Sequence, residues 1–389
     1  MQKNFLNETD NAILVGVGVG RNTTEDALDE LSTLCKTANI VEVGRIIQNR
    51  HDIDATYYVG KGKVEEIRLL VEETGANVVV FDVELSGSKV RNLERELEVP
   101  VLDRSKVILD IFASRAQSRE GQLQVELAQL KYNLPRLASG AGAFMSKMKN
   151  AVGMRGPGEK KLEMDKRKIR DEIVELQKEI EKLKGNRAVN KKQSVKSGKA
   201  RVGLVGYTNS GKTTLLSTFA KTDVGGEDKL FATLDTKTAT LFITPDVAPE
   251  DYDYEKHAGK EFLITDTVGF VDKLPHEFIS AFESTLAETR ESDLLLHIID
   301  VSNPDVVKQI SVVSAVMEKI GAHEIPVVYV LNKVDRLGQT DREIIRDEIV
   351  ETFGAGKSGD KCGIRYIEIS ARKNQNIDAL KQLIFEMLG

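Results

Sequence analysis

Short apolar runs alternate with amphipathic segments over the first part of the chain. Four runs are typical of buried strands: AILVGVGV (12–19), NIVEVGRII (39–47), NVVVFDV (77–83) and VPVLD (99–103). Helical periodicity lies between and after them, over residues 25–36, 62–74, 86–97 and 105–114. This alternation predicts a small α/β domain with a largely parallel sheet over residues 1–115.

The hydrophobic pattern then becomes purely helical. Leucines repeat at helical spacing up to Pro135, which is expected to stop the helix; they are Leu123, Leu127, Leu130 and Leu134. A second stripe repeats in alternating threes and fours up to an expected C-cap at Gly185, through Leu162, Ile169, Ile173, Leu176, Ile180 and Leu183. An antiparallel helical hairpin is therefore predicted over residues 116–185, with a glycine-rich tip loop at about 135–160.

Residues 186–200 contain almost no apolar side chains and are predicted to be a basic linker. A further domain is expected over residues 201–389, where VGLVGYTNSGKTTLL (202–216) reads as a strand, a glycine-rich turn and the start of a helix. Gly206, Gly211, Lys212 and Thr213 fit the phosphate-loop pattern G-x-x-x-x-G-K-[ST]. The loop's backbone N–H groups would wrap a phosphate at the helix N-terminus, and Lys212 would reach the β- and γ-phosphates.

Two later strand ends favour guanine over adenine. VVYVLNKVD ends in the pattern N-K-x-D, and YIEISAR ends in Ser-Ala. The Asp335 carboxylate could accept hydrogen bonds from guanine N1–H and its amino group, and adenine offers no such pair of donors. Because sites built on buried polar pairing discriminate strongly, GTP and GDP are the expected ligands.

Mg²⁺ is the expected cofactor. Asp266 in FLITDTVGF would hold it through water, the Thr213 hydroxyl would bind it directly, and Thr233 in LFATLD would complete its shell, with Thr236 or Thr238 as alternatives. The Gly269 N–H would meet the γ-phosphate, so the two loops around Thr233 and Gly269 would act as switches. Lys212, Thr233 and Gly269 are the candidate catalytic residues.

The residues expected to line the nucleotide are Gly206, Tyr207, Thr208, Asn209, Ser210, Gly211, Lys212, Thr213, Thr214, Phe231, Ala232, Thr233, Leu234, Asp235, Asp266, Thr267, Val268, Gly269, Asn332, Lys333, Asp335, Ser370, Ala371 and Arg372. Phe270 follows Gly269, where a water-orienting Gln stands in Ras-like enzymes, and a phenyl ring cannot orient water. Either another group does so, or hydrolysis is slow until a partner assists it. Asn209 could help to hold K⁺ beside the phosphates, or could serve only as a turn residue.

Charge distribution points to a polyanion. The net charge is -6, yet residues 136–170 are rich in Lys and Arg, and Lys182 to Arg201 contains no acidic residue. A polyanion partner and a merely solvated helix face both remain open on charge alone. Two cysteines far apart, no long apolar run and no basic-then-apolar leader favour a cytoplasmic protein without a membrane span, expected to be a monomer.

Two glycine patterns in the first domain could bind nucleotides or anions. Gly16, Gly18 and Gly20 are spaced G-x-G-x-G, which departs from the dinucleotide fingerprint. The GKGK stretch at residues 60–63 could cradle an anion or simply form a strand-to-helix turn with solvated lysines.

The motifs GYTNSGKTT, FATLD, DTVGF, NKVD and SAR resemble those of the HflX GTPases, which are relatives of the Obg proteins. Segments outside the G domain, including YYVGKGKVEEI and RGPGEKKLEMDKRKIRDEI, extend the resemblance over nearly the whole chain. It implies an N-terminal α/β domain with a long helical hairpin, then a Ras-like P-loop G domain. It also implies a GTPase that docks on the large (50S) ribosomal subunit, with the hairpin tip directed toward the peptidyl-transferase region.

The resemblance implies that the tip loop contacts ribosomal RNA. Basic groups would neutralise rRNA phosphates and exposed side chains would pack on bases, the candidates being Phe144, Met145, Lys147, Lys149 and Arg155. The segment AFMSKMKNAVGM departs from the glycine run typical of the family, Thr236-Lys237 stand where Pro-Thr is usual, and the acidic loop 245–256 is longer than expected. Because Gly389 follows shortly after the G-domain motifs, the additional C-terminal domain of some members is expected to be absent.

Three functions follow as hypotheses. The first is a GTPase that acts on the ribosome by splitting, rescuing or assembling it. The second is an RNA-binding remodeller that uses ATP at an N-terminal site containing GKGK. The third is a stress-signalling switch that binds a protein through its GTP-ordered loops.

Overall fold

The computed structural model describes residues 10–19, 25–138, 158–195, 199–220, 231, 237–245, 259–272, 288–353 and 365–388. The chain divides into two compact units, Met1–Glu181 and Lys182–Gly389. Within the described ranges, none of the helices combines the length and apolarity that crossing a membrane requires.

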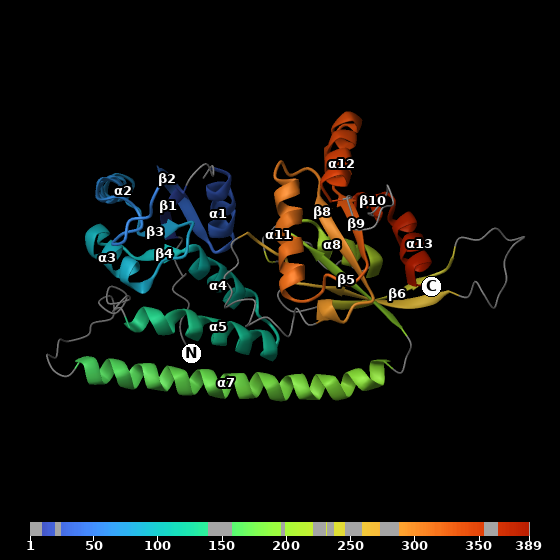
Figure 1. The fold of residues 1–389 in the computed structure, drawn as a ribbon, viewed down its shortest axis with the longest axis horizontal. Coiled ribbons are helices and arrows are strands. Elements are labelled where there is room, and N and C mark those ends of the chain that lie inside the picture. The colour runs from blue at the N-terminus through green and yellow to red at the C-terminus, as the bar shows by residue number, and fades with distance from the viewer. Residues whose placement is uncertain are drawn as a thin grey trace, which may run out of the picture. The chain divides into compact units, whose positions relative to one another are not determined.

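The first unit contains the predicted α/β domain (Figure 1). Its elements are β1 (Asp10–Val19), α1 (Glu25–Thr37), β2 (Ile40–Arg50), α2 (Lys61–Thr74), β3 (Val78–Phe81), α3 (Gly87–Leu97), β4 (Val101–Asp103) and α4 (Arg104–Arg115). The strands form a parallel sheet in the order β2-β1-β3-β4. Each predicted strand and helix of this domain is present, with ends shifted by a few residues at most.

Alternation along β1 distributes side chains to both faces of this sheet. Ile13, Val15 and Val17 pack in a cluster with α2 and α3. The other face meets α1, since a Cβ at Gly16 would lie 3.0 Å from Leu28 Cγ. Helices therefore cover both faces, as the apolar character of β1 requires.

Two long helices follow: α5 (Arg119–Ala138) and α7 (Gly158–Val195). The start of α5 meets the C-terminal half of α7, where Arg119 Nη2 lies 3.0 Å from Glu179 Oε1, so the pair is antiparallel as predicted. Leu176 and Ile180, on the predicted stripe of α7, are buried. The predicted tip loop falls mostly outside the described residues.

Both predicted helix ends were wrong. Helix α5 continues through Pro135 because its last turn is held by Arg136, whose Nη2 donates to Leu85 O and Asp103 Oδ2, each at 2.8 Å. Helix α7 continues through Gly185 to Val195, across most of the segment expected to be a linker. One glycine costs a helix only about 1 kcal/mol relative to Ala, and the lysines and Gln that follow are good helix formers.

The second unit has the P-loop architecture that the motifs predicted. Its elements are β5 (Ala200–Gly206), α8 (Lys212–Ala220), β6 (Lys237–Ile243), β7 (Lys260–Asp266), β8 (Leu294–Asp300), α11 (Val306–Lys319), β9 (Val327–Asn332), the 3₁₀ turn η2 (Val334–Arg336), α12 (Gln339–Phe353), β10 (Arg365–Glu368) and α13 (Ile377–Leu388). The sheet order is β10-β9-β8-β5-β7-β6, with only β6 antiparallel to its neighbour among the described strands.

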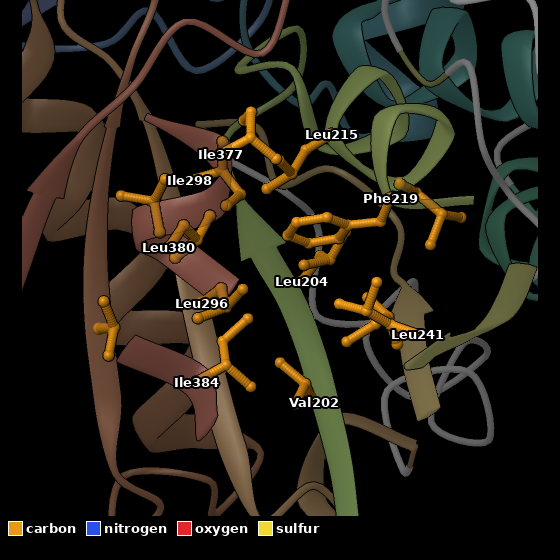
Figure 2. Close-up of a cluster of buried hydrophobic side chains, with 14 of the residues drawn as sticks. Val202, Leu204, Leu215, Phe219, Leu241, Leu296, Ile298, Ile377, Leu380 and Ile384 are labelled. Atoms are coloured by element: carbon orange, nitrogen blue, oxygen red, sulfur yellow. The ribbon is translucent and has the colours of Figure 1, made fainter. Parts of the chain in front are cut away.

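Helices sandwich this sheet. Figure 2 shows side chains of α8 and α13 packed with those of β5 and β8 in one buried cluster. A second cluster joins α11 and α12 to β8 and β9. Since β5, β7, β8, β9 and β10 are parallel, their carboxyl ends lie at one edge of the sheet, and the motif residues come together there.

Candidate nucleotide site

The phosphate loop needs glycine at both of its fixed positions. A Cβ at Gly206 would lie 2.3 Å from Ile298 O, and one at Gly211 would lie 2.3 Å from Asn332 Nδ2. Gly211 also has φ 101°, which side-chain-bearing residues rarely adopt. The loop thus folds tightly between β8 and β9, which explains the spacing of the two glycines.

Lys212 is buried at the centre of the loop. Its Nζ donates to Gly206 O at 3.1 Å and to Tyr207 O at 2.8 Å. Burial lowers the pKa of Lys212 to about 8; Asp266 opposes this change and Lys333 adds to it. An ammonium group held here by carbonyl oxygens is suited to meet phosphate oxygens.

Two hydroxyls of the loop are buried, those of Thr208 and Ser210. Neither oxygen has a hydrogen-bond partner within the described part of the chain. Buried polar groups are rarely left in this state in folded proteins. The loop is thus equipped with polar groups for a polar ligand.

A hydroxyl and a carboxylate lie together beside the loop. Thr213 Oγ1 donates to Asp266 Oδ2 at 2.8 Å, and Asp266 is fully buried at the end of β7. A hydroxyl and a carboxylate are hard oxygen donors, which suit Mg²⁺. Thr233 lies outside the described residues, and so does Thr236. Thr238 is on β6 with its hydroxyl 3.3 Å from that of Thr265.

Asn332 joins the phosphate loop to the loop after β10. Its side chain is buried, donates to Ser210 O at 2.8 Å and accepts from Ala371 N at 3.0 Å. Ser370 Oγ donates to Asp335 Oδ1 at 2.7 Å, and this bond lowers the pKa of Asp335. The N-K-x-D and Ser-Ala motifs thus converge, with an ionised carboxylate between them. Arg372 is exposed.

Asp300, at the carboxyl end of β8, belongs to this network although no sequence motif indicated it. Its Oδ2 accepts from Lys333 Nζ at 2.6 Å, and the same ammonium donates to Asn209 O at 2.7 Å. Asp300 Oδ1 accepts from Ser302 N at 3.0 Å and from the Ser302 hydroxyl. The only signal in the sequence is an acidic residue at the end of the apolar run LLLHIID.

The D-x-x-G segment lies against the phosphate loop. A Cβ at Gly269 would be 3.0 Å from Thr208 Cα and 3.1 Å from Lys212 Nζ. Thr267 Oγ1 donates to Leu204 O at 2.6 Å, and Val268 is buried. Phe270 is only 2% exposed, so its ring is part of the core and is not available to an attacking water.

Other predicted residues occupy less informative places. Thr214 lies in α8 and Phe231 is buried. Ala232, Leu234 and Asp235 lie outside the described residues, as do the tip residues Phe144, Met145, Lys147, Lys149 and Arg155 and most of the acidic loop. Asn209 has a left-handed backbone at φ 59° and an exposed side chain, which fits its role as a turn residue.

The glycine patterns of the first unit form ordinary structure. Gly16 and Gly18 lie within β1, paired with β2, and not at a strand-to-helix turn; Gly20 is outside the described residues. In GKGK, Gly60 N donates to Gln48 Oε1 at 3.0 Å and Lys63 pairs with Glu66 at 2.6 Å. These contacts favour a simple turn over an anion cradle.

Comparison with known proteins places these features in context. Three family models match successive segments: "GTP-binding GTPase N-terminal" over residues 25–113, "GTP-binding GTPase Middle Region" over 115–194 and "50S ribosome-binding GTPase" over 201–333. The chain is 44% identical to the GTPase HflX of Caldanaerobacter subterraneus subsp. tengcongensis, over 97% of this chain and 80% of that protein. It is 41% identical to the GTPase HflX of Escherichia coli, over 87% of this chain and 76% of that protein.

Among solved structures, the chain is similar to a GTP-binding protein from the hyperthermophilic archaeon Sulfolobus solfataricus in complex with GDP. The identity is 21% and the TM-score 0.48, over 97% of this chain and 98% of that chain.

Proposed function

Because this chain belongs to the HflX family of GTPases, we propose that it hydrolyses GTP to GDP and phosphate with Mg²⁺ while bound to the large ribosomal subunit. The observation that carries the nucleotide part is the position of Asn332, which connects the phosphate loop to the Ser-Ala loop. One buried amide thereby sets the distance between the phosphate and guanine ends of the proposed site.

The phosphate end would work through backbone amides and Lys212. Tight packing at Gly206 and Gly211 fixes the loop before ligand arrives, so little reorganisation is needed on binding. Lys212 would exchange its carbonyl partners for β- and γ-phosphate oxygens. The hydroxyls of Thr208 and Ser210 are further donors within the same loop.

Thr213 and Asp266 would hold Mg²⁺, Thr213 directly and Asp266 through water, with Thr233 closing the shell. The hydrogen bond of 2.8 Å between the Thr213 hydroxyl and the Asp266 carboxylate supports this assignment, because it brings the two oxygen donors together. When bound, the metal ion would neutralise charge on the β- and γ-phosphates. Gly269 would donate its N–H to the γ-phosphate.

Guanine would be recognised by Asp335. Its carboxylate is held by Ser370 and lies 3.8 Å from Lys373 Nζ, both of which favour the ionised form that accepts two hydrogen bonds. Lys333 and Ala371 would complete the pocket beside it.

Hydrolysis is proposed to be slow until the ribosome assists it. The buried Phe270 ring cannot orient water, and the chain offers no polar side chain at that position. A K⁺ ion near Asn209 is a second route to stabilising charge in the transition state, which equal rates in Na⁺ and K⁺ buffers would exclude.

The large subunit is proposed as the partner on two grounds: the match of residues 201–333 to a model described as a 50S ribosome-binding GTPase, and the basic residues of the tip loop. The cytoplasm follows from that partner, and a monomer remains the expected state. Splitting or rescue of stalled ribosomes is the preferred outcome of docking, with a role in subunit assembly as the other.

Sedimentation of 70S ribosomes tests this proposal. With the protein and a non-hydrolysable GTP analogue, we expect co-sedimentation with 50S subunits and a decrease of the 70S peak; GDP should give neither. Co-sedimentation with intact 70S alone would exclude splitting, and absence from every ribosomal fraction would exclude the ribosomal partner.

A further inference from the structure

Three hydrogen bonds attach the segment after Gly269 to the phosphate loop. Phe270 N donates to Gly206 O at 3.1 Å, and Thr208 N donates to Phe270 O at 2.7 Å. These backbone bonds form a parallel bridge between Tyr207 and Phe270. The third bond comes from Asp272 N, which donates to the Tyr207 hydroxyl at 2.7 Å.

Tyr207 is thus the side-chain member of this attachment. It is 8% exposed, so its phenol is enclosed by protein and has few other positions to adopt. Asp272 makes a further contact through its carboxylate, which lies 3.1 Å from Lys308 Nζ on α11. Residues 270–272 are therefore fixed to two elements, the phosphate loop and α11.

Gly269 precedes these fixed residues, so its backbone position depends on them. Its backbone is already in close contact with Thr208 and Lys212. If the stretch after it were loosened, its N–H could turn away from the phosphates while the phosphate loop itself stayed intact. The γ-phosphate contact would suffer, and contacts to the α- and β-phosphates would not.

We propose that Tyr207 is a positioning residue whose hydroxyl holds the D-x-x-G segment at the phosphate loop, so that Gly269 meets the γ-phosphate of GTP. This inference rests on the proposed role of Gly269. Tyr207 would thereby differ from the rest of the phosphate loop, because its hydroxyl should affect the binding of GTP and leave the binding of GDP unchanged.

Tyr207→Phe separates this role from packing, because it keeps the ring and removes the one oxygen that accepts from Asp272 N. The matched control is Tyr366→Phe on β10, where the side chain is 38% exposed. Loss of one hydrogen bond between neutral groups corresponds to a change of about threefold to tenfold. The measurements are single-turnover GTP hydrolysis by the full chain without ribosomes, and affinities for GDP and a non-hydrolysable GTP analogue.

We expect Tyr207→Phe to lower both hydrolysis and affinity for the GTP analogue by about threefold to tenfold, with GDP affinity within about twofold of the parent. Tyr366→Phe should match the parent throughout. An unchanged hydrolysis rate, or an equal loss of GDP and GTP analogue affinity, would overturn the role of Tyr207. If the parent chain binds neither GDP nor the GTP analogue, the proposed function fails instead.

Discussion

Lys333 joins three loops through one ammonium group. Its backbone is left-handed at φ 66°, a conformation that costs free energy for any residue with a side chain. The contacts with Asp300 and Asn209 O compensate for this cost and fix the direction of the following residues, including Asp335. Asp300 is therefore expected to influence nucleotide binding without touching the nucleotide.

Asp300→Ala should lower affinity for GDP and GTP alike, by at least about tenfold, because hydrogen bonds to charged groups contribute about 1.5–3 kcal/mol. Asp300→Asn should lose less, since it keeps an acceptor for the Lys333 ammonium. Fluorescent-nucleotide titration measures both, with Asp341→Ala on the exposed start of α12 as the control. If Asp300→Ala lowers affinity for GTP alone, Asp300 does not act through the guanine end of the proposed site, which GDP and GTP share.

His297 on β8 predicts an acid-side loss of stability. Burial, assisted by Lys212, lowers the pKa of His297 to about 3, so between pH 6.5 and pH 3 the unfolded chain binds a proton that the folded one does not. The contribution of His297 to the free energy of unfolding is fully present above the pKa of the unfolded chain and decreases as pH falls through this window. From pH 7 to pH 5 the loss from this residue is about 2 kcal/mol.

Urea unfolding of the parent and of His297→Phe at both pH values isolates this contribution. The substitution keeps an aromatic ring beside Tyr329, whose centroid lies 5.5 Å from that of His297. Between pH 7 and pH 5, the free energy of unfolding of the variant should fall by about 2 kcal/mol less than that of the parent. Equal losses would mean that His297 is not the group responsible.

Among the elements of the first unit, local patterns predicted the helices and strands, while the end of α5 depended on distant contacts. Pro135 carries a strong local stop signal, but Arg136 binds Leu85 O and Asp103 from positions 51 and 33 residues away. No periodicity in the sequence reveals such a contact. The same holds for Tyr207 and Asp272, separated by 65 residues.

Asp103 is the buried centre of the contact between α5 and the first sheet. It is fully buried and accepts from Leu85 N, Tyr132 Oη and Arg136 Nη2 at 3.1, 2.7 and 2.8 Å. Asp103→Ala would leave the Arg136 guanidinium buried without this carboxylate, at a cost of about 3–5 kcal/mol. Hydrogen exchange on the intact protein should show loss of protection in α5.

Tyr132→Phe is the milder companion, because it removes only one hydrogen bond of the same network and should cost about 1 kcal/mol. GDP binding should be unchanged in both variants, since every member of this network belongs to the first unit. Unaltered protection of α5 in Asp103→Ala would show that the helix is held by its apolar stripe alone.

At the scale of the whole molecule, the positions of the phosphate-loop, N-K-x-D and Ser-Ala motifs were predictable because each is a short local pattern after a strand. Lys212, Thr213 and Asp335 all lie where the spacing placed them, at one edge of the second sheet. Asp300 was not predictable, because its role depends on strand order, which brings β8 beside β9.

The basic tip loop is the proposed contact with ribosomal RNA. Reversing the charges of Lys147, Lys149 and Arg155 should weaken binding to 50S subunits and flatten its dependence on salt, with basal GTP hydrolysis unchanged. Lys36, Lys319 and Arg365 are exposed basic residues on other elements and supply a control of equal net charge. Equal weakening by both triple variants would attribute binding to overall charge rather than to the tip.

The rate of GTP hydrolysis with and without purified 50S subunits tests most directly whether this GTPase acts on the ribosome. We predict that turnover rises by at least about tenfold on adding the subunits, because the buried Phe270 ring after Gly269 cannot orient water and the proposed mechanism leaves this task to the partner. A rate that is unchanged by saturating 50S subunits would contradict the claim that this GTPase acts on the ribosome.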